Sequence, residues 1–143
     1  MVLIGTDSPT LPLGSLRQAA AWLSGAAPAD AVIGPALDGG YYLIGVRRAL
    51  PSLFQPGIAW STEQVLPETL RRLCALGREG LAVRLLPPFY DVDTPSDLVQ
   101  LAADLSMVRG DPSEKTMSAD ADAPATRAVL RALGLLAVPP AAR

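Results

Sequence analysis

Short apolar runs alternate along this chain with longer stretches in which apolar residues recur every three or four positions. Four runs have the length and the closing glycine, proline or polar turn of buried strands: residues 2–5, 31–36, 41–46 and 81–86. Three stretches have the spacing of helices with one apolar face: residues 13–24, 61–77 and 94–105. This alternation predicts an α/β fold in which helices flank a sheet.

The connection between the second and third runs constrains the sheet. It consists of Leu37, Asp38, Gly39 and Gly40, which is too short for the crossover of roughly a dozen residues that parallel neighbours need. The third strand should therefore run antiparallel to the second or leave its register. We expect a mixed, mostly parallel sheet.

Local signals predict where the helices begin and end. Gly25 stops the first helix, and Ser61 with Gln64 three positions later matches a capping box at the start of the second. Thr94 is the expected N-cap of the third helix, with Pro95 at its first position.

The carboxyl-terminal part changes in composition. Residues 107–124 are polar and rich in Ser, Asp and Pro, which predicts a flexible linker between an α/β domain of residues 1–106 and a last short helix and tail at 125–143. That helix should dock through Val129, Leu130 and Leu133.

Composition narrows the possible chemistry. The 143 residues are 50% hydrophobic, which suits one core, and the net charge of −2 comes without any basic stripe. We therefore expect no nucleic-acid or membrane binding. The start of the chain lacks the features of a secretory signal, and a single cysteine rules out an intramolecular disulfide, so a cytoplasmic protein is expected. The absence of histidine excludes Ser-His-Asp and Cys-His catalysis and histidine-containing zinc sites.

Four acidic residues follow predicted strands: Asp7, Asp38, Asp91 and Asp93. Ligands bind beyond the carboxyl ends of strands in open α/β sheets, so these side chains should converge on one edge. Clustered carboxylates repel one another unless a cation lies among them, and a set of oxygen ligands favours Mg²⁺ or Mn²⁺. The sequence contains no Walker loop and no G-x-G-x-x-G motif.

Each of these signals also has a purely structural interpretation. Asp7 could cap the turn before Pro9, and Asp38 could serve the tight turn that Gly39 permits. Asp91 and Asp93 could be loop acids near a helix amino terminus. The aromatic residues are more often packing groups than ligand platforms.

Four motifs together resemble a known family: GTDSPTLP, DGGYYLIG, WSTEQVL and YDVDTPSDL, in this order. They resemble a bacterial GT-A-like glycosyltransferase family of the arsenosugar-biosynthesis type. That family is similar in fold to molybdenum-cofactor guanylyltransferases and phospholactate guanylyltransferases. The resemblance covers about residues 2–105, and ATRAVLRAL resembles the family's closing helix.

The resemblance implies roles for particular residues. Asp7 matches the metal-binding aspartate, although Asp7-Ser8-Pro9 stands where GT-A enzymes have Asp-x-Asp, and Asp91 or Asp93 matches the second metal-facing element. Asp7 and Asp38 are the candidate catalytic residues. Two further sets would line the sugar or acceptor pocket and its rim: Asp38, Gly39 and Gly40, and Trp60, Ser61 and Thr62.

Members of that family begin with a further strand and a loop containing Gly, Lys and Arg that holds the nucleotide. This chain starts after these elements, so the resemblance implies a fold that is incomplete at its amino terminus. The first strand would then be an unpaired edge, available for self-association.

The expected activity is transfer of a sugar from a nucleotide-diphosphate donor to a small acceptor, with Mg²⁺ or Mn²⁺. One alternative is a guanylyltransferase-like nucleotidyltransferase acting on a phosphorylated small molecule. Another is a catalytically inactive truncated fragment or interaction module.

Overall fold

The structure is a computed structural model that describes residues 1–77, 80–107 and 123–137. Its centre is a four-stranded sheet with the order β1-β3-β2-β4. The strands are β1 (Val2–Ile4), β2 (Ala31–Pro35), β3 (Tyr41–Val46) and β4 (Val83–Leu85). The mixed α/β architecture expected from the alternating pattern is confirmed.

The direction of β3 is also the one predicted from its short connection to β2. β3 pairs antiparallel with both β1 and β2, whereas β2 pairs parallel with β4. β1, β2 and β4 therefore point the same way, and their carboxyl ends meet at one edge of the sheet. The loops that carry the acidic residues leave from this edge.

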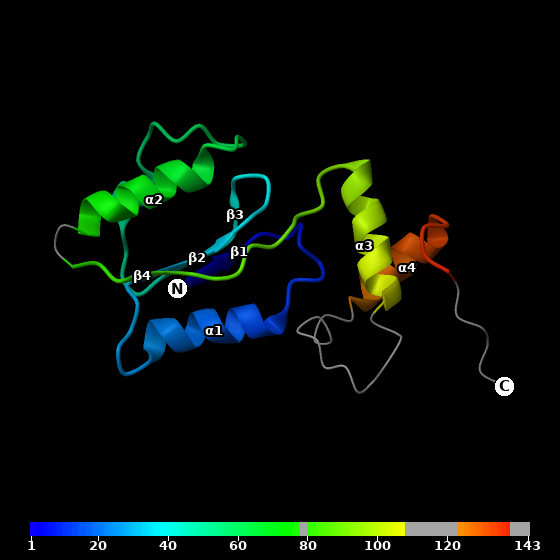
Figure 1. Cartoon of the computed structure of the whole chain (residues 1–143), viewed down its shortest axis with the longest axis horizontal. Helices are drawn as coiled ribbons and strands as arrows, with labels where there is room; N and C mark the ends of the chain where they lie inside the picture. Colours follow the sequence, from blue (N-terminus) through cyan, green and yellow to red (C-terminus); the bar gives the residue numbers. More distant parts are fainter. Residues whose placement is uncertain (78–79, 108–122, 138–143) are drawn as a thin grey trace.

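Two helices cover opposite faces of the sheet (Figure 1): α1 (Leu13–Ser24) and α2 (Val65–Leu76). Successive strand residues point to opposite faces, so β2 contributes to both cores. Ile33 packs with Leu73 of α2 in one cluster, and Val32 packs with Ala19 of α1 in the other. Gly25 ends α1 as predicted.

The two outer strands are less buried than their apolar runs predict. Leu3 and Ile4 of β1 are 50% and 51% exposed, and Leu85 of β4 is 50% exposed. Each strand has one neighbour in the sheet, since β1 pairs with β3 and β4 pairs with β2. An apolar run identifies a strand, but the number of its neighbours decides how far it is buried.

Two helices lie beside the sheet (Figure 1): α3 (Pro95–Met107) and α4 (Pro124–Ala132). Leu101 and Leu105 of α3 share a core with Leu130 of α4. Val129 and Leu133 are 57% and 62% exposed, so the predicted docking of α4 through all three apolar residues is wrong for these two. The predicted linker, 107–124, falls mainly on residues 108–122, which lie outside the described residues.

The start of α3 has the predicted cap. The Thr94 N–H donates to Asp97 Oδ2 at 2.7 Å, and the Asp97 N–H donates to Thr94 Oγ1 at 3.4 Å. This reciprocal pair is a capping box with Asp in place of Glu. Asp97 also accepts a hydrogen bond from the Asp93 N–H, so the cap fixes the loop that carries one of the candidate ligands.

The predicted cap of α2 is wrong. The helix begins at Val65, and Ser61 has a positive φ of 61°. The Leu66 N–H donates to the Gly39 carbonyl at 2.8 Å. Contact with the β2–β3 turn therefore decides the conformation of residues 61–64 and outweighs the local capping signal.

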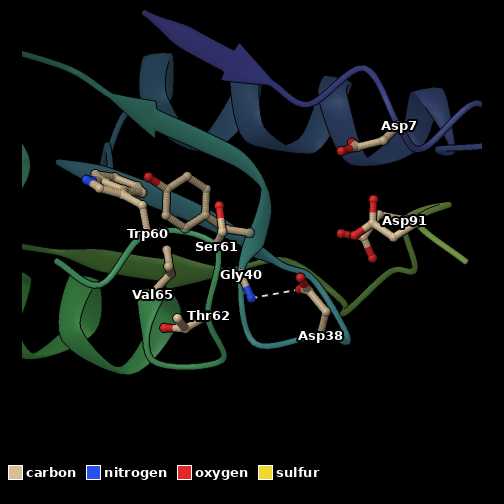
Figure 2. A pocket seen from close by; sticks show the side chains of 10 residues that line it. Asp7, Asp38, Gly40, Trp60, Ser61, Thr62, Val65 and Asp91 are labelled. Carbon is tan, nitrogen blue, oxygen red and sulfur yellow. Dashed lines mark hydrogen bonds between the residues drawn. The ribbon is translucent and has the colours of Figure 1, made fainter.

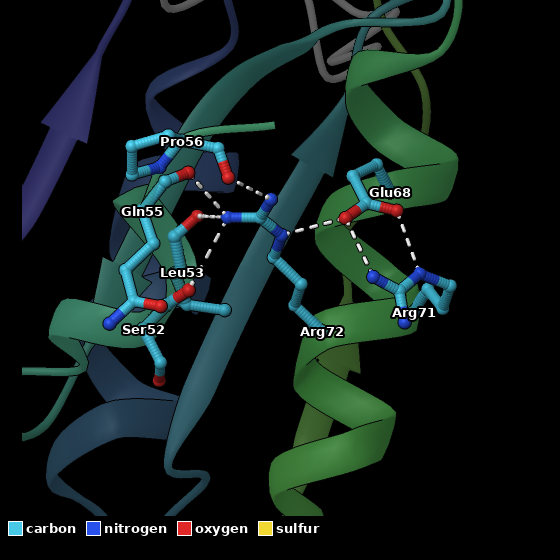
Figure 3. Close-up of polar contacts among 7 residues, drawn as sticks. All are labelled: Ser52, Leu53, Gln55, Pro56, Glu68, Arg71 and Arg72. Carbon is cyan, nitrogen blue, oxygen red and sulfur yellow. Dashed lines mark hydrogen bonds and ion pairs between the residues drawn. The ribbon is translucent and has the colours of Figure 1, made fainter. Parts of the chain in front are cut away.

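A partly buried arginine of α2 holds a segment that precedes this helix (Figure 3). Arg72 of α2 donates to four main-chain carbonyls in and after the short helix η1 (Pro51–Phe54), which belong to Ser52, Leu53, Gln55 and Pro56. Its Nε lies 2.7 Å from Glu68 Oε1. Hydrogen bonds from Arg71 and Arg72 lower the pKa of Glu68 to about 2, so this carboxylate stays ionised well into the acid range.

Replacing Arg72 by Ala should lower the free energy of unfolding by about 2 kcal/mol, because a charged donor that satisfies several carbonyls is lost. Urea unfolding followed by circular dichroism measures this change. Arg71→Ala is the matched control, because Arg71 pairs with the same Glu68 but its side chain is 68% exposed. Surface pairs contribute little, so an equal loss in both variants would contradict the role of the carbonyl contacts.

Candidate functional site

The four predicted carboxylates line one cleft at the carboxyl edge of the sheet (Figure 2). The cleft has a volume of about 520 Å³, and its wall includes Asp7, Asp38, Asp91 and Asp93. The convergence predicted from the strand order is confirmed. The functional roles assigned to these residues stay predictions.

Asp7 lies in the loop that leaves β1. Its carbonyl accepts a hydrogen bond from the Val92 N–H at 2.9 Å, which joins this loop to the one that carries Asp91 and Asp93. Figure 2 shows the Asp7 and Asp91 side chains on the same side of the cleft, opposite Trp60. A Cβ at Gly5 would lie 2.6 Å from Asp7 Oδ1, so glycine at this position leaves room for the carboxylate.

Asp38 lies in the turn between β2 and β3, where both interpretations of its role are compatible. Its Oδ1 accepts the Gly40 N–H at 2.8 Å, as an Asx turn requires. Gly39 has a φ of 95°, and a Cβ there would lie 2.5 Å from the Glu63 Cα. The turn therefore holds Asp38 in place while the rest of its exposed carboxylate faces the cleft.

Three of the carboxylates form a tight group. One oxygen each from Asp38, Asp91 and Asp93 lies within 4.8 Å of the other two. The resemblance predicted Asp7 with Asp91 or Asp93 as metal ligands, whereas the structure brings Asp38 rather than Asp7 into this group. Asp7 remains on the same wall.

Negative charge is concentrated at Asp91. Burial raises the pKa of this carboxyl, and the nearby charges of Asp38, Asp93 and Asp7 raise it further. The ionised form of Asp91 is therefore less stable than that of a solvated aspartate, and a cation or a donor group nearby would stabilise it. Perturbation of this kind in a cleft is typical of functional sites.

The opposite side of the cleft is formed by the segment before α2. Trp60, Ser61 and Thr62, which the resemblance placed at the rim of a substrate pocket, line this side (Figure 2). The Trp60 side chain is 53% exposed. Ser61 adopts a left-handed backbone conformation, which costs energy for a residue with a side chain and is often found at functional sites. A flat, exposed indole at the rim of the cleft provides a stacking surface for a ring.

Two features of the site were missed from the sequence. Tyr41 and Val65 also line the cleft, and the position of Tyr41 directly after the Asp38–Gly40 turn was a usable signal. Thr10 and Asp104 contact Tyr90 behind the acidic loops. Their distance along the chain gave no local signal for that contact.

Among the described residues, no helix combines the length and the apolar character needed to cross a membrane.

Comparisons with known proteins agree with this architecture. Residues 1–62 match the model of a family described as "Uncharacterized protein conserved in bacteria (DUF2064)". No curated protein matches the chain. A solved structure from Desulfovibrio desulfuricans G20, described as a "putative nucleotide-diphospho-sugar transferase", is 31% identical with a TM-score of 0.64.

The alignment with that structure covers 92% of this chain and 52% of the other, so the chain spans about half the length of its relative. The mixed sheet, the helices on both of its faces and this likeness lead to one conclusion about architecture. The chain has the α/β fold of nucleotide-diphospho-sugar transferases.

Proposed function

We propose that the acidic cleft binds a nucleotide-diphosphate sugar together with Mg²⁺ or Mn²⁺, and that the protein transfers the sugar to a small acceptor. The observation that carries this proposal is the group of Asp38, Asp91 and Asp93 at the carboxyl edge of the sheet. The description of the solved relative supports the class of reaction. The arsenosugar-biosynthesis type remains a prediction from the resemblance alone.

The residues present fit a divalent cation. Three carboxylates from two loops offer hard oxygen donors within 4.8 Å of one another, which matches the preference of Mg²⁺ and Mn²⁺. Burial raises the pKa of Asp91, and the neighbouring charges of Asp38, Asp93 and Asp7 add to the rise, which a bound cation would offset. Asp38, Asp91 and Asp93 would hold the ion, which would supply charge neutralisation for the departing diphosphate.

The remaining residues would bind and orient the substrates. Asp7 lies outside the three-carboxylate group and is free to accept hydrogen bonds from hydroxyl groups of the donor sugar or the acceptor. Trp60 presents a ring face, and Thr62 lines the same wall. The Gly40 N–H donates to Asp38 Oδ1, and this bond fixes the direction in which Oδ2 points.

The exposed edge of β1 bears on whether the chain acts alone. Met1 and Val46 exchange hydrogen bonds through their main-chain groups, and the Gly5 N–H donates to the Tyr42 carbonyl. In an antiparallel ladder the main-chain groups of Val2 and Ile4 then face away from β3. We therefore also propose that this edge pairs with a strand of another chain. Size-exclusion chromatography tests this, because pairing would give an apparent mass above that of the monomer.

The proposal is tested by titrating the purified chain with nucleotide-diphosphate sugars in the presence and absence of Mn²⁺. Binding should depend on the metal, and Asp7→Ala should weaken it by about tenfold through loss of hydrogen bonds to an ionised acceptor. Quenching of Trp60 fluorescence reports binding. The measurement is made in a Trp22→Phe variant, because Trp22 is the other tryptophan of the chain.

Three outcomes would contradict the proposal. Metal-dependent binding that is unchanged in Asp7→Ala would show that Asp7 does not have the substrate-binding role proposed for it. Turnover of a nucleoside triphosphate with release of pyrophosphate, and none of a nucleotide sugar, would assign nucleotidyl transfer instead. A stably folded chain with neither metal nor nucleotide dependence would assign a non-enzymatic interaction module.

A further inference from the structure

A chain of hydrogen bonds lies behind the acidic cleft and connects three segments that are far apart in the sequence. The Tyr90 hydroxyl donates to Asp104 Oδ2 at 2.8 Å and lies 3.1 Å from Thr10 Oγ1. Gln100 Nε2 donates to the other oxygen of Asp104 at 2.8 Å. With its proton donated to Asp104, the Tyr90 oxygen is left to accept from Thr10.

Two members of this hydrogen-bond network, Tyr90 and Thr10, adjoin loops that carry carboxylates of the cleft. Tyr90 directly precedes Asp91, and Thr10 is in the same loop as Asp7 and is only 8% exposed. Asp104 belongs to α3, and Leu101 and Leu105 of the same helix are buried in its core with α4. One hydroxyl therefore ties both acidic loops to a packed helix.

The Asp7 loop and the loop of Asp91 and Asp93 are also joined by a main-chain hydrogen bond. The Val92 N–H donates to the Asp7 carbonyl, and this bond limits the separation of the loops but leaves them free to hinge about it. The Tyr90 hydroxyl contacts a second point of the Asp7 loop. Two separate contacts fix the orientation of one loop relative to the other, whereas a single contact does not.

We propose that Tyr90 is a positioning residue for the cleft, and that its hydroxyl, held by Asp104, fixes the loop that carries Asp91 and Asp93 against α3 and the Asp7 loop, and so orients these two carboxylates. The proposal rests on the proposed metal-binding function. Residues behind a ligand shell commonly orient it, and their loss weakens metal affinity by about 10- to 100-fold.

Tyr42 of β3 provides a matched control. Its hydroxyl donates to the Pro87 carbonyl at 2.9 Å, and its ring contacts Phe89 edge to face. The Tyr90 ring likewise contacts Phe89, with centroids 4.9 Å apart. Tyr→Phe at either position removes a partly buried hydroxyl and keeps the ring. Tyr42→Phe loses the bond to Pro87, whereas Tyr90→Phe loses the bonds with Asp104 and Thr10, and only these link the acidic loops.

The experiment measures Mn²⁺ affinity of the chain by electron paramagnetic resonance, together with its Tm. Tyr90→Phe should weaken Mn²⁺ binding by about tenfold, while Tyr42→Phe should bind Mn²⁺ as the wild type does. A similar fall in Tm for the two variants would show that stability does not explain the difference.

Variants of Asp104 test whether the hydroxyl acts through its acceptor. Asp104→Ala should weaken Mn²⁺ binding as Tyr90→Phe does, and the double variant should be no weaker than either single one. Asp104→Asn keeps an oxygen acceptor and should restore most of the affinity. Wild-type affinity in Tyr90→Phe, or an equal loss in Tyr42→Phe, would overturn the inference. Absence of Mn²⁺ binding in the wild type would instead overturn the proposed function on which it rests.

Discussion

Replacement of Asp91 by Asn should weaken Mn²⁺ binding by about 100-fold and at the same time raise the Tm of the metal-free chain by a few degrees. Asp91 belongs to the three-carboxylate group, so the variant removes a ligand oxygen with its charge. It also removes the cost of burying this charge and the repulsion that Asp38, Asp93 and Asp7 exert on it. Loss of binding with a gain in stability distinguishes a functional carboxylate from a structural one.

The pH dependence of that gain follows from the raised pKa of Asp91. The folded chain binds this proton more tightly than the unfolded chain, so the contribution to stability is complete below the ordinary pKa of 3.8 and is lost as the pH rises through the folded value. The variant should therefore be more stable than the wild type at pH 7. The difference should disappear as the pH falls below about 3.8.

Asp30→Asn is the matched control, since it makes the same change of charge outside the cleft. Asp30 Oδ2 accepts the Ala82 N–H, and Asn retains an oxygen for that bond. This variant should keep the metal affinity of the wild type. Thermal melts with and without Mn²⁺ provide both measurements, because a ligand of the folded state raises the Tm. An Asp91→Asn chain that Mn²⁺ still stabilises to the wild-type extent would remove Asp91 from the site.

Gly39→Ala should lower the free energy of unfolding by about 3 kcal/mol and abolish nucleotide-sugar binding. The φ of 95° is unfavourable for any residue with a Cβ. The added methyl would also lie 2.5 Å from the Cα of Glu63, and main chain at that distance must move. The segment that moves carries Trp60, Ser61 and Thr62, so the rim of the cleft shifts away from Asp38.

Two other glycines separate the effect of the positive φ from the effect of the steric contact with Glu63. Gly80 has a φ of 85°, and a methyl group added there would have no atom within 4 Å, so Gly80→Ala tests the backbone contribution alone at about 1 kcal/mol. Gly14 lies in the first turn of α1 with equally open surroundings, and Gly14→Ala should not destabilise the chain. Urea unfolding gives the three free energies. A loss at Gly39 no larger than that at Gly80 would show that the contact with Glu63 does not matter.

Local sequence signals were reliable where a residue's partners lie close along the chain. The boundaries of α1 and β3, the antiparallel direction of β3 and the cap of α3 at Thr94 all depend on neighbours within a few positions. The same type of signal failed at Ser61, because the competing partner of that segment is Gly39. Apolar spacing likewise failed at Val129 and Leu133, which are exposed although they fit a helical face.

The sequence by itself determined the alternation of strands and helices, and with it the fact that acidic residues follow three parallel strands. Because parallel strands end at one edge, their convergence in a single cleft needed no knowledge of packing. Only the tertiary structure decided which carboxylates form the tight group. The turn at Gly39 and Gly40 brings Asp38 to Asp91 and Asp93, whereas Asp7 stays apart. Distances of a few ångströms between loops depend on contacts such as the one between Tyr90 and Asp104, whose partners no local pattern in the sequence connects.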